Sequence, residues 1–425
     1  MSSVKKKVKK LLLREFYYPI VVQQRLRKQV NGVKSKDKIT IAFITMNIAM
    51  WKCQGLYDLL RSNERFRLYI VISPSVKFDK DVRIRDAKIM REYFSERNMP
   101  YVDWDIEHGM EPEDIKTTIN PDILFFTQPG KKVFTKEHSY QHFRDKLLCY
   151  IPYGFYMHRN EHMYNREFQN IAWKLYYFTT TQQHLARIYG LNKGRNVVVV
   201  GYPSFDQYTK ESFTDVWKIK DNSLKRIVWA PHFTITKSLI EGFKPRSTFL
   251  LLHDMMLRIA CQYEDKIQIA FKPHPRLLTE LYNNPDWGKQ RADEYYERWR
   301  NMKNGQLETG DFINLFYFSD ALIHDSSSFV VDYIYFKKPE LFLTDNIDDY
   351  IQESDEVAQE IYQNIYHGVS EDEICQFIDN VVLSGNDPLY KYRLNILKEH
   401  LLPPNGKTSS ENIYNDLCRS LAISI

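Results

Sequence analysis

Short apolar runs alternate with longer stretches of helical pattern from residue 38 onward, and this alternation predicts the fold class. In the first half, apolar runs of strand length occupy residues 39–45, 68–73, 122–129, 147–154, 175–181 and 196–204. Near-continuous apolar strands separated by helices are typical of a parallel sheet covered on both faces. The first half therefore predicts an α/β domain.

The same alternation starts again in the second half. Apolar runs cover residues 226–233, 266–275, 319–325 and 339–344, with helical patterns between them. The polar stretch 215–226 carries no strand pattern and is the predicted linker. We therefore expect an α/β protein of two facing Rossmann-like domains, with a cleft between them. The expected division is a basic N-terminal segment (1–37), an N-terminal α/β domain (38–214), a C-terminal α/β domain (226–390) and C-terminal helices (391–425).

Composition excludes several classes of protein. Of 425 residues, 43% are hydrophobic and 27% charged, as in soluble globular proteins, and no apolar run is long enough for a transmembrane helix. The five cysteines form no CxxC pair, which indicates a reducing compartment without a disulfide framework or zinc site. The N-terminus lacks the apolar core and cleavage site of a signal peptide. We expect a cytoplasmic protein.

Positive charge gathers at the start of the chain. The first 28 residues hold nine Lys and Arg, including Lys6 and Lys7, against the single acid Glu15, with Leu, Phe, Tyr, Ile and Val between them. This mixture suits a segment that lies on an anionic membrane surface, here the inner face of the cell membrane. The alternative is a solvated basic helix or a frayed tail, because Pro19 is expected to break a long amphipathic helix.

The stretch FKPHPR (271–276) places Lys272, His274 and Arg276 directly after an expected strand. Pro273 and Pro275 hold the preceding residues extended, so alternation would bring the three side chains to one side. Such a cationic trio suits a phosphate or diphosphate, and His274 could also transfer a proton. The alternative is a loop histidine between two surface cations.

The stretch HDSSS (324–328) places Asp325 and the serines Ser326, Ser327 and Ser328 between an expected strand and a helix that begins near Ser327. The unpaired N–H groups and the dipole of a helix start favour an anion, and serine hydroxyls add donors. Asp325 is a second candidate cap. Asp332, more than a turn further on, either accepts a hydrogen bond from a sugar-like hydroxyl or faces solvent. Plain N-capping is the alternative for the serines.

Two other strand ends carry candidate groups. In IPYGFYMHRN (151–160), Gly154 would let a ligand approach the backbone beside Tyr153, and His158 and Arg159 are candidate catalytic or acceptor-side groups. A turn with an aromatic anchor is the alternative. His232 in WAPHF (229–233) is a donor contact or a loop histidine.

No motif predicts a metal or a cofactor. The chain lacks GxGxxG, GxxxxGK[ST], HExxH and GxSxG. The two Asp-x-Asp pairs, at Asp79 and Asp81 and at Asp103 and Asp105, are interpreted as surface acids. A metal-independent mechanism needs cations and helix N-termini to stabilise a leaving phosphate, and the later motifs provide them.

These motifs, in this order, resemble the CDP-glycerol glycerophosphotransferase family of teichoic-acid primases and polymerases. The resemblance covers roughly residues 120–350, and its most specific block is DFINLFYFSDALIHDSSSFVVDYIYFKKPELFL. It implies a glycosyltransferase-B type fold, often on a membrane periphery. The implied reaction moves glycerol phosphate, or a related polyol phosphate, from a CDP-activated donor to a hydroxyl of a lipid-linked surface glycan and releases CMP.

The resemblance also implies roles for particular residues. His274 would lie beside the donor phosphate, Ser327 and Ser328 would bind the donor phosphates, and Asp332 would lie near the donor. The family usually has Trp-His-Gly where this chain has Pro152, Tyr153 and Gly154. The histidine expected to act as base is thus replaced by Tyr153, and His158 is the candidate substitute.

Two rival hypotheses stay open. One is a sugar-nucleotide glycosyltransferase of the same fold, which would release a nucleoside diphosphate. The other is a degenerate relative that binds a glycan or nucleotide without catalysis. The expected partners are a CDP-activated donor, a lipid-linked glycan and an anionic membrane surface, with no nucleic acid.

Overall fold

The chain forms two compact units, which are described separately. The computed structural model describes residues 3–104, 106–130, 132–209, 212–221, 223–235, 246–310 and 312–424. The first unit comprises Met1–Asp206 and Leu401–Ile425, and the second comprises Gln207–His400. The side chains of Lys6 and Lys7, and Asp105 of the second Asp-x-Asp pair, lie outside the described residues.

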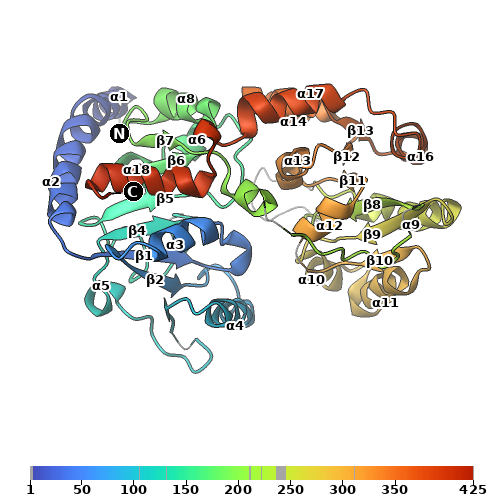
Figure 1. Cartoon of the computed structure of the whole chain (residues 1–425), viewed down its shortest axis with the longest axis horizontal. Coiled ribbons are helices and arrows are strands. Elements are labelled where there is room, and N and C mark those ends of the chain that lie inside the picture. The colour runs from blue at the N-terminus through green and yellow to red at the C-terminus, as the bar shows by residue number, and fades with distance from the viewer. Residues whose placement is uncertain are drawn as a thin grey trace. The chain divides into compact units, whose positions relative to one another are not determined.

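The first unit is built on a parallel sheet with helices on both of its faces (Figure 1). Within the described residues its strand order is β3-β2-β1-β4-β5-β6-β7, and every neighbouring pair is parallel. The strands are β1 (Ile39–Thr45), β2 (Phe66–Ile72), β3 (Tyr101–Val102), β4 (Ile123–Phe126), β5 (Leu147–Tyr150), β6 (Lys174–Tyr177) and β7 (Val197–Val199). The helices are α1 (Ser3–Leu12), η1 (Leu13–Val22), α2 (Gln23–Lys34), η2 (Ile48–Met50), α3 (Gln54–Arg61), α4 (Lys80–Glu96), α5 (Ile115–Thr118), α6 (Glu161–Tyr164), α7 (Glu167–Ile171), α8 (Thr180–Tyr189), η6 (Pro404–Gly406) and α18 (Ser409–Leu421).

The second unit has a second parallel sheet, with the strand order β10-β9-β8-β11-β12-β13 among the described residues. Its strands are β8 (Lys225–Ala230), β9 (Ile267–Phe271), β10 (Gly305–Leu307), β11 (Ala321–His324), β12 (Glu340–Leu343) and β13 (Tyr366–Gly368). Its helices are α9 (Phe249–Gln262), α10 (Leu277–Tyr282), α11 (Gly288–Asn301), α12 (Ile313–Phe318), α13 (Ser327–Ile334), α14 (Ile347–Glu353), α15 (Glu356–Gln363), α16 (Glu371–Phe377), η4 (Ile378–Leu383) and α17 (Tyr390–Ile396). The segments η3 (Pro203–Thr209) and η5 (Leu397–Leu401) cross the unit boundaries.

The strands are buried on both faces, as their sequences predict. Every residue of β4, β5, β9, β11 and β12 is buried, so the uninterrupted apolar runs correspond to strands between two helical layers. In the second unit, aromatic rings fill this layer: Trp229 lies 4.9 Å from Phe271 and 5.6 Å from Trp299 between ring centroids. This packing holds the ends of β8 and β9 against α11. The predicted α/β class is confirmed.

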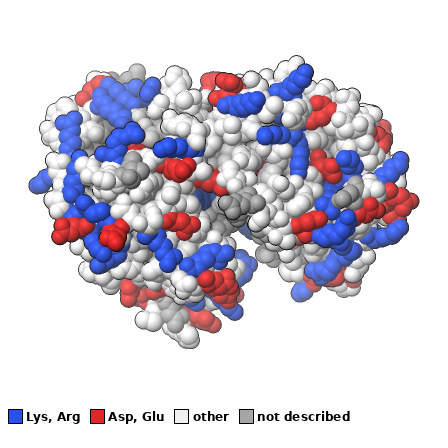
Figure 2. Space-filling model, viewed as in Figure 1, with Lys and Arg blue, Asp and Glu red and all other residues white. Residues whose placement is uncertain are grey.

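The N-terminal helices correct the expectation that Pro19 breaks the chain's helical start. The segments α1, η1 and α2 follow one another without a break, and Pro19 lies inside η1, which is π-helical. A π-helical turn is wider than an α-helical one, and it accommodates a residue that has no N–H to donate. Figure 2 shows Lys and Arg side chains over this part of the first unit.

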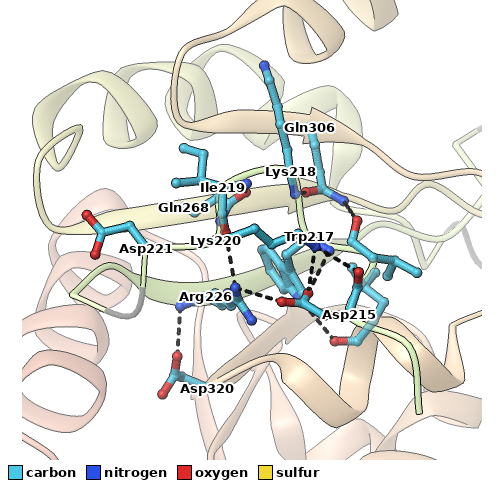
Figure 3. A network of polar contacts seen from close by, with 12 residues as sticks. Asp215, Trp217, Lys218, Ile219, Lys220, Asp221, Arg226, Gln268, Gln306 and Asp320 are labelled. Carbon is cyan, nitrogen blue, oxygen red and sulfur yellow. Dashed lines mark hydrogen bonds and ion pairs between the residues drawn. The ribbon is translucent and has the colours of Figure 1, made fainter.

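The polar stretch 215–226 is not a connection between the units, because it lies within the second unit. Side-chain amides of the sheet hold its backbone: Gln306 Oε1 accepts the Lys218 N–H (2.6 Å), and Gln268 Oε1 accepts the Ile219 N–H (2.9 Å) (Figure 3). Buried Trp217 donates from Nε1 to the Leu315 carbonyl at 3.1 Å. Side-chain amides, and not a neighbouring strand, hold the backbone of this segment. Its sequence therefore shows no strand pattern. Asn222 lies outside the described residues.

Arg226 anchors this segment and gives a testable stability prediction. Its buried guanidinium donates to Asp215 Oδ2 and to the Ile219 carbonyl, both at 3.1 Å, whereas Lys220 approaches the same carboxylate with 58% of its side chain exposed. We expect Arg226→Ala to lower the free energy of unfolding by about 3 kcal/mol, since it leaves the half-buried Asp215 carboxylate with exposed Lys220 as its remaining cationic partner. Lys220→Ala, the matched control, should cost less than about 1 kcal/mol. Equal losses in urea titrations of the two variants would contradict this account.

The first unit is completed by the end of the chain. The carboxylate of Asp206, the last residue before the chain enters the second unit, accepts the N–H groups of Ser409 and Ser410 at 2.8 Å each. These bonds satisfy the start of α18, whose residues Leu417 and Leu421 are buried in the first unit's core. The chain thus leaves the first unit at Asp206 and returns to it at Leu401.

Candidate active site

Three neighbouring strand ends in the second unit bring the predicted phosphate motifs together. Strand β8 lies between β9 and β11, and the register places Trp229 beside both Phe271 and Ile323. Because the strands are parallel, the segments that follow them leave the sheet at one edge. His232, the FKPHPR stretch and the HDSSS stretch therefore meet at this edge, as the sequence predicts.

Backbone bonds continue beyond the ends of β8 and β9 and fix the histidines. The N–H of Lys272 donates to the Trp229 carbonyl at 2.8 Å, and the N–H of His274 donates to the Pro231 carbonyl at 3.0 Å. The imidazole centroids of His232 and His274 lie 5.3 Å apart. Phe233 stands beside both, at 4.4 Å from each ring. The two imidazoles thus form a single aromatic cluster.

His274 is a neutral imidazole with its proton on Nε2. Its Nδ1 accepts the N–H of Arg276 at 3.1 Å, so Nδ1 carries the lone pair. Burial lowers the pKa of His274 to about 3, and the neighbouring His232 and the cations Arg276 and Lys272 add to the effect. His274 therefore offers an Nε2–H donor and has no free lone pair with which to act as a base.

His232 has the same arrangement. The N–H of Arg246 donates to Thr234 Oγ1 at 3.2 Å, and the hydroxyl of Thr234 can then donate to His232 Nδ1 at 2.9 Å. Burial lowers the pKa of His232 to about 4, with Arg246 and Arg276 contributing. The site thus holds two neutral imidazoles, each with an Nε2–H group, and Thr234 is a supporting residue that the sequence analysis missed.

The cations of FKPHPR are not arranged in one extended row. Lys272 is buried, but Arg276 is exposed and already helical in backbone conformation, since it precedes α10. Its guanidinium lies 4.2 Å above the Phe233 ring and bonds Glu280 Oε1 at 2.8 Å. The expected alternation of Lys272, His274 and Arg276 is therefore wrong at Arg276, because the helix starts there. Both cations remain close enough to depress the pKa of His274.

Asp325 holds the site together and does not cap α13. Its buried carboxylate accepts the N–H of His232 (2.5 Å), the N–H of Thr248 (2.6 Å) and the hydroxyl of Thr248 (2.9 Å). It thereby joins the ends of β8 and β11 to the start of α9. A local pattern points to Thr248, since Ser247 and Thr248 precede an apolar helical run.

The serines of HDSSS are not used as helix caps. Helix α13 begins at Ser327, as predicted, but Ser326 makes no side-chain capping bond. The hydroxyls of Ser326 and Ser328 instead bond one another at 2.9 Å, while Ser327 is half-buried and Ser328 exposed. Plain N-capping therefore does not explain the serines. Hydroxyls at an uncapped helix start are suited to an anionic oxygen.

Asp332 is buried, so the alternative that it faces solvent is wrong. Its Oδ1 accepts a hydrogen bond from the Tyr208 hydroxyl at 2.6 Å. Both residues belong to the second unit. Tyr208 lies 124 positions earlier in the chain, and no local pattern predicts this partner.

The acceptor-side candidates belong to the first unit. Tyr153, Gly154 and His158 are partly buried in the segment after β5, and Arg159 is exposed. A Cβ atom on Gly154 would meet no other heavy atom within 4 Å, so its backbone is open to approach. Burial raises the pKa of Tyr153, and its hydroxyl is therefore neutral at physiological pH.

Comparison with known proteins places the chain in a family. A model of the CDP-Glycerol:Poly(glycerophosphate) glycerophosphotransferase family matches residues 154–419. No curated protein matches the chain by sequence. Among solved structures, a variant of the wall teichoic acid polymerase TagF is 13% identical, with a TM-score of 0.57 over 99% of this chain and 100% of that one. A TagF structure soaked with CDPG has a TM-score of 0.56 at 14% identity, over 99% of this chain and 100% of that chain.

An enzyme of another kind shares the fold. A UDP-N-acetylglucosamine 2-epimerase from Listeria monocytogenes is 13% identical, with a TM-score of 0.57 over 90% of this chain and 96% of that one. At these identities the structural likeness shows the glycosyltransferase-B type fold alone. The assignment to a family rests on the family model, which matches more than half of the chain. The chain therefore belongs to the CDP-Glycerol:Poly(glycerophosphate) glycerophosphotransferase family and is a CDP-glycerol glycerophosphotransferase-like enzyme.

Proposed function

We propose that this enzyme transfers glycerol phosphate, or a related polyol phosphate, from a CDP-activated donor to a hydroxyl of a membrane-linked surface glycan and releases CMP. The observation that supports it is the set of hydrogen-bond donors at one edge of the second sheet. The neutral imidazoles of His232 and His274, Lys272 and the uncapped start of α13 all lie there. Such donors match the oxygens of a diphosphate.

The chemistry follows from these donors. An acceptor hydroxyl oxygen attacks the phosphorus that carries the polyol, a new P–O bond forms, and the bond to the bridging oxygen breaks. CMP leaves with that oxygen and its electron pair. The Nε2–H groups of His232 and His274, together with Lys272, stabilise charge that grows on the departing phosphate. Ser327 and Ser328 contribute hydroxyl and N–H donors to the same diphosphate.

The proton of the acceptor hydroxyl needs a base other than His274, whose Nδ1 already accepts the Arg276 N–H. We assign this role to His158. Tyr153 stands where the family has histidine. It is a poor base because burial raises its pKa and so keeps its hydroxyl protonated. Gly154 and Arg159 complete the acceptor-side assignment, because Arg159 is exposed and its positive charge suits an anionic acceptor.

Nucleotide release tests this reaction. Purified enzyme would be incubated with CDP-glycerol or CDP-ribitol and a lipid-linked acceptor, with UDP-sugars as the comparison. We expect CMP to accumulate only when donor and acceptor are both present. Release of a nucleoside diphosphate from a UDP-sugar would indicate a sugar-nucleotide glycosyltransferase instead. No release from any pair, while CDP-glycerol still binds, would indicate a degenerate relative.

The N-terminal helices are the proposed attachment to the membrane. On one side Tyr18, Val22 and Leu26 are buried against the first unit's core. On the other side Leu12 and Phe16 are 60% and 56% exposed, and exposed Lys side chains precede them in α1. None of the described helices has the length and apolar character to cross a membrane. We infer that this segment lies flat on the anionic inner face of the cell membrane.

Vesicle binding tests this attachment. The double variant Leu12→Ser/Phe16→Ser should weaken binding to vesicles of 30% phosphatidylglycerol by about tenfold or more, because two exposed apolar side chains no longer enter the lipid. Leu251→Ser is the matched control, since Leu251 is 66% exposed on α9 of the second unit. Equal binding of the double variant and the control would rule out this surface.

A further inference from the structure

A fully buried pair of ionisable residues lies directly behind the serines of the proposed donor site. His324, the last residue of β11, and Glu340, the first of β12, both have no exposed side-chain surface. His324 Nε2 and Glu340 Oε2 are 3.0 Å apart. On the other edge of the ring, His324 Nδ1 lies 3.0 Å from the carbonyl oxygen of Ser326. Neither member of the pair is used in the reaction described above.

The contacts of the pair determine where its protons lie. A carbonyl oxygen only accepts hydrogen bonds, so His324 Nδ1 carries a proton and donates it to Ser326. One further proton is shared between Nε2 and the Glu340 carboxyl, which makes the pair neutral as a whole. Burial lowers the pKa of His324 to about 4 and raises that of Glu340 well above its usual range. Burial thus favours the uncharged forms of both groups, in which the Glu340 carboxyl donates a hydrogen bond to Nε2.

The bond to Ser326 sets the direction of the next backbone donor. The Ser326 carbonyl accepts His324 Nδ1–H and also the N–H of Phe329, at 3.1 Å. In a planar trans peptide the C=O and N–H point in opposite directions. The N–H of Ser327 belongs to the same peptide unit as this carbonyl. It therefore points away from His324 and Phe329, out of the start of α13.

We propose that His324 and Glu340 are positioning residues of the donor site, which orient the Ser326–Ser327 peptide so that the start of α13 presents its N–H and hydroxyl groups to the donor diphosphate. This inference rests on the proposed function, because it takes the donor diphosphate as the group that binds at the start of α13. The chain of contacts runs from Glu340 through His324 to the backbone of Ser326. Neither side chain touches the donor.

Donor affinity tests the inference. Titration calorimetry with CDP-glycerol would compare the full-length enzyme with His324→Phe, which removes the Nδ1–H, and with Glu340→Met, which removes the donor to Nε2. We expect both variants to bind at least about tenfold more weakly. Glu340→Gln should stay within about threefold of the parent, since an amide N–H can replace the carboxyl proton toward Nε2.

His138→Phe is the matched control. His138 is also a buried imidazole whose ring nitrogens contact a hydroxyl, Ser73 Oγ at 2.9 Å, and a carbonyl, that of Glu113 at 3.0 Å, but it belongs to the first unit. This control should leave CDP-glycerol affinity unchanged. If His324→Phe binds as tightly as the parent, or if Glu340→Gln binds as weakly as Glu340→Met, the positioning role is wrong and the proposed function still stands.

Hydrogen exchange separates failure of this inference from failure of the proposed function. Without any ligand, His324→Phe should speed amide exchange in residues 326–329 by tenfold or more, and His138→Phe should not. Faster exchange in an enzyme that does not bind CDP-glycerol would keep the pair as the support of α13 and refute the proposed donor. Unchanged exchange at 326–329 would overturn the positioning role whatever the donor.

Discussion

Replacing His274 with Ala is expected to slow CMP release by about two to three orders of magnitude, the loss typical of removing one donor aimed at developing charge. The reason is that His274 presents a neutral Nε2–H, held in place by the Arg276 N–H on Nδ1. His274→Gln should recover part of this rate, because an amide N–H can replace the ring donor. Single-turnover rates of CMP release at saturating CDP-glycerol measure the effect.

The pH dependence distinguishes a donor from a base at this position. Because the pKa of His274 lies at about 3, the free enzyme keeps this imidazole neutral at pH 5 and above. The profiles of kcat/KM between pH 5 and 8 should therefore have the same shape in the parent and in His274→Gln. An ionisation near pH 6.5 that disappears in the variant would show that His274 acts as a base. His253→Ala, on α9, is the control and should retain the parent rate.

Replacing Asp325 with Ala is expected to produce the largest loss of stability in the second unit, about 4 kcal/mol. The carboxylate accepts three hydrogen bonds, and its removal leaves buried donors of His232 and Thr248 without a partner. Urea unfolding followed by tryptophan fluorescence reports the change, because Trp217, Trp229 and Trp299 are all buried in the second unit.

Thr248→Val is the variant with which the loss of stability in Asp325→Ala is compared. It removes a single hydroxyl bond to Asp325 and should cost about 1 kcal/mol, a quarter of the larger effect. If Asp325→Ala costs no more than Thr248→Val, the carboxylate does not hold β8, β11 and α9 together. Donor affinity should fall in Asp325→Ala even in the folded fraction, because the backbone of His232 loses its anchor.

The strand ends could be predicted from the sequence because the signals there are local. Uninterrupted apolar runs mark β9 and β11, prolines mark the exit from β9, and the serines mark the start of α13. Parallel neighbours then bring His232, His274 and Ser327 to one edge without further information.

What the sequence did not reveal depends on partners far along the chain. From its position just before α13, Asp325 is expected to cap that helix, yet its carboxylate accepts the N–H of Thr248, 77 positions away. Asp332 pairs with Tyr208, and the backbone of residues 215–226 bonds amides of Gln268 and Gln306. No periodicity marks such contacts. The expectation for Pro19 is wrong for a different reason: a π-helical turn accommodates a proline that an α-helix would not.

The return of α18 to the first unit has a consequence for the order of folding. The capping bonds from Asp206 to Ser409 and Ser410 close this unit only when the last helix has been made. During synthesis all of Gln207–His400 leaves the ribosome before that helix does. The second unit can therefore reach its native state while the first unit still exposes part of its core. The N-terminal half of the nascent chain is thus the part that depends on chaperones for the longest time.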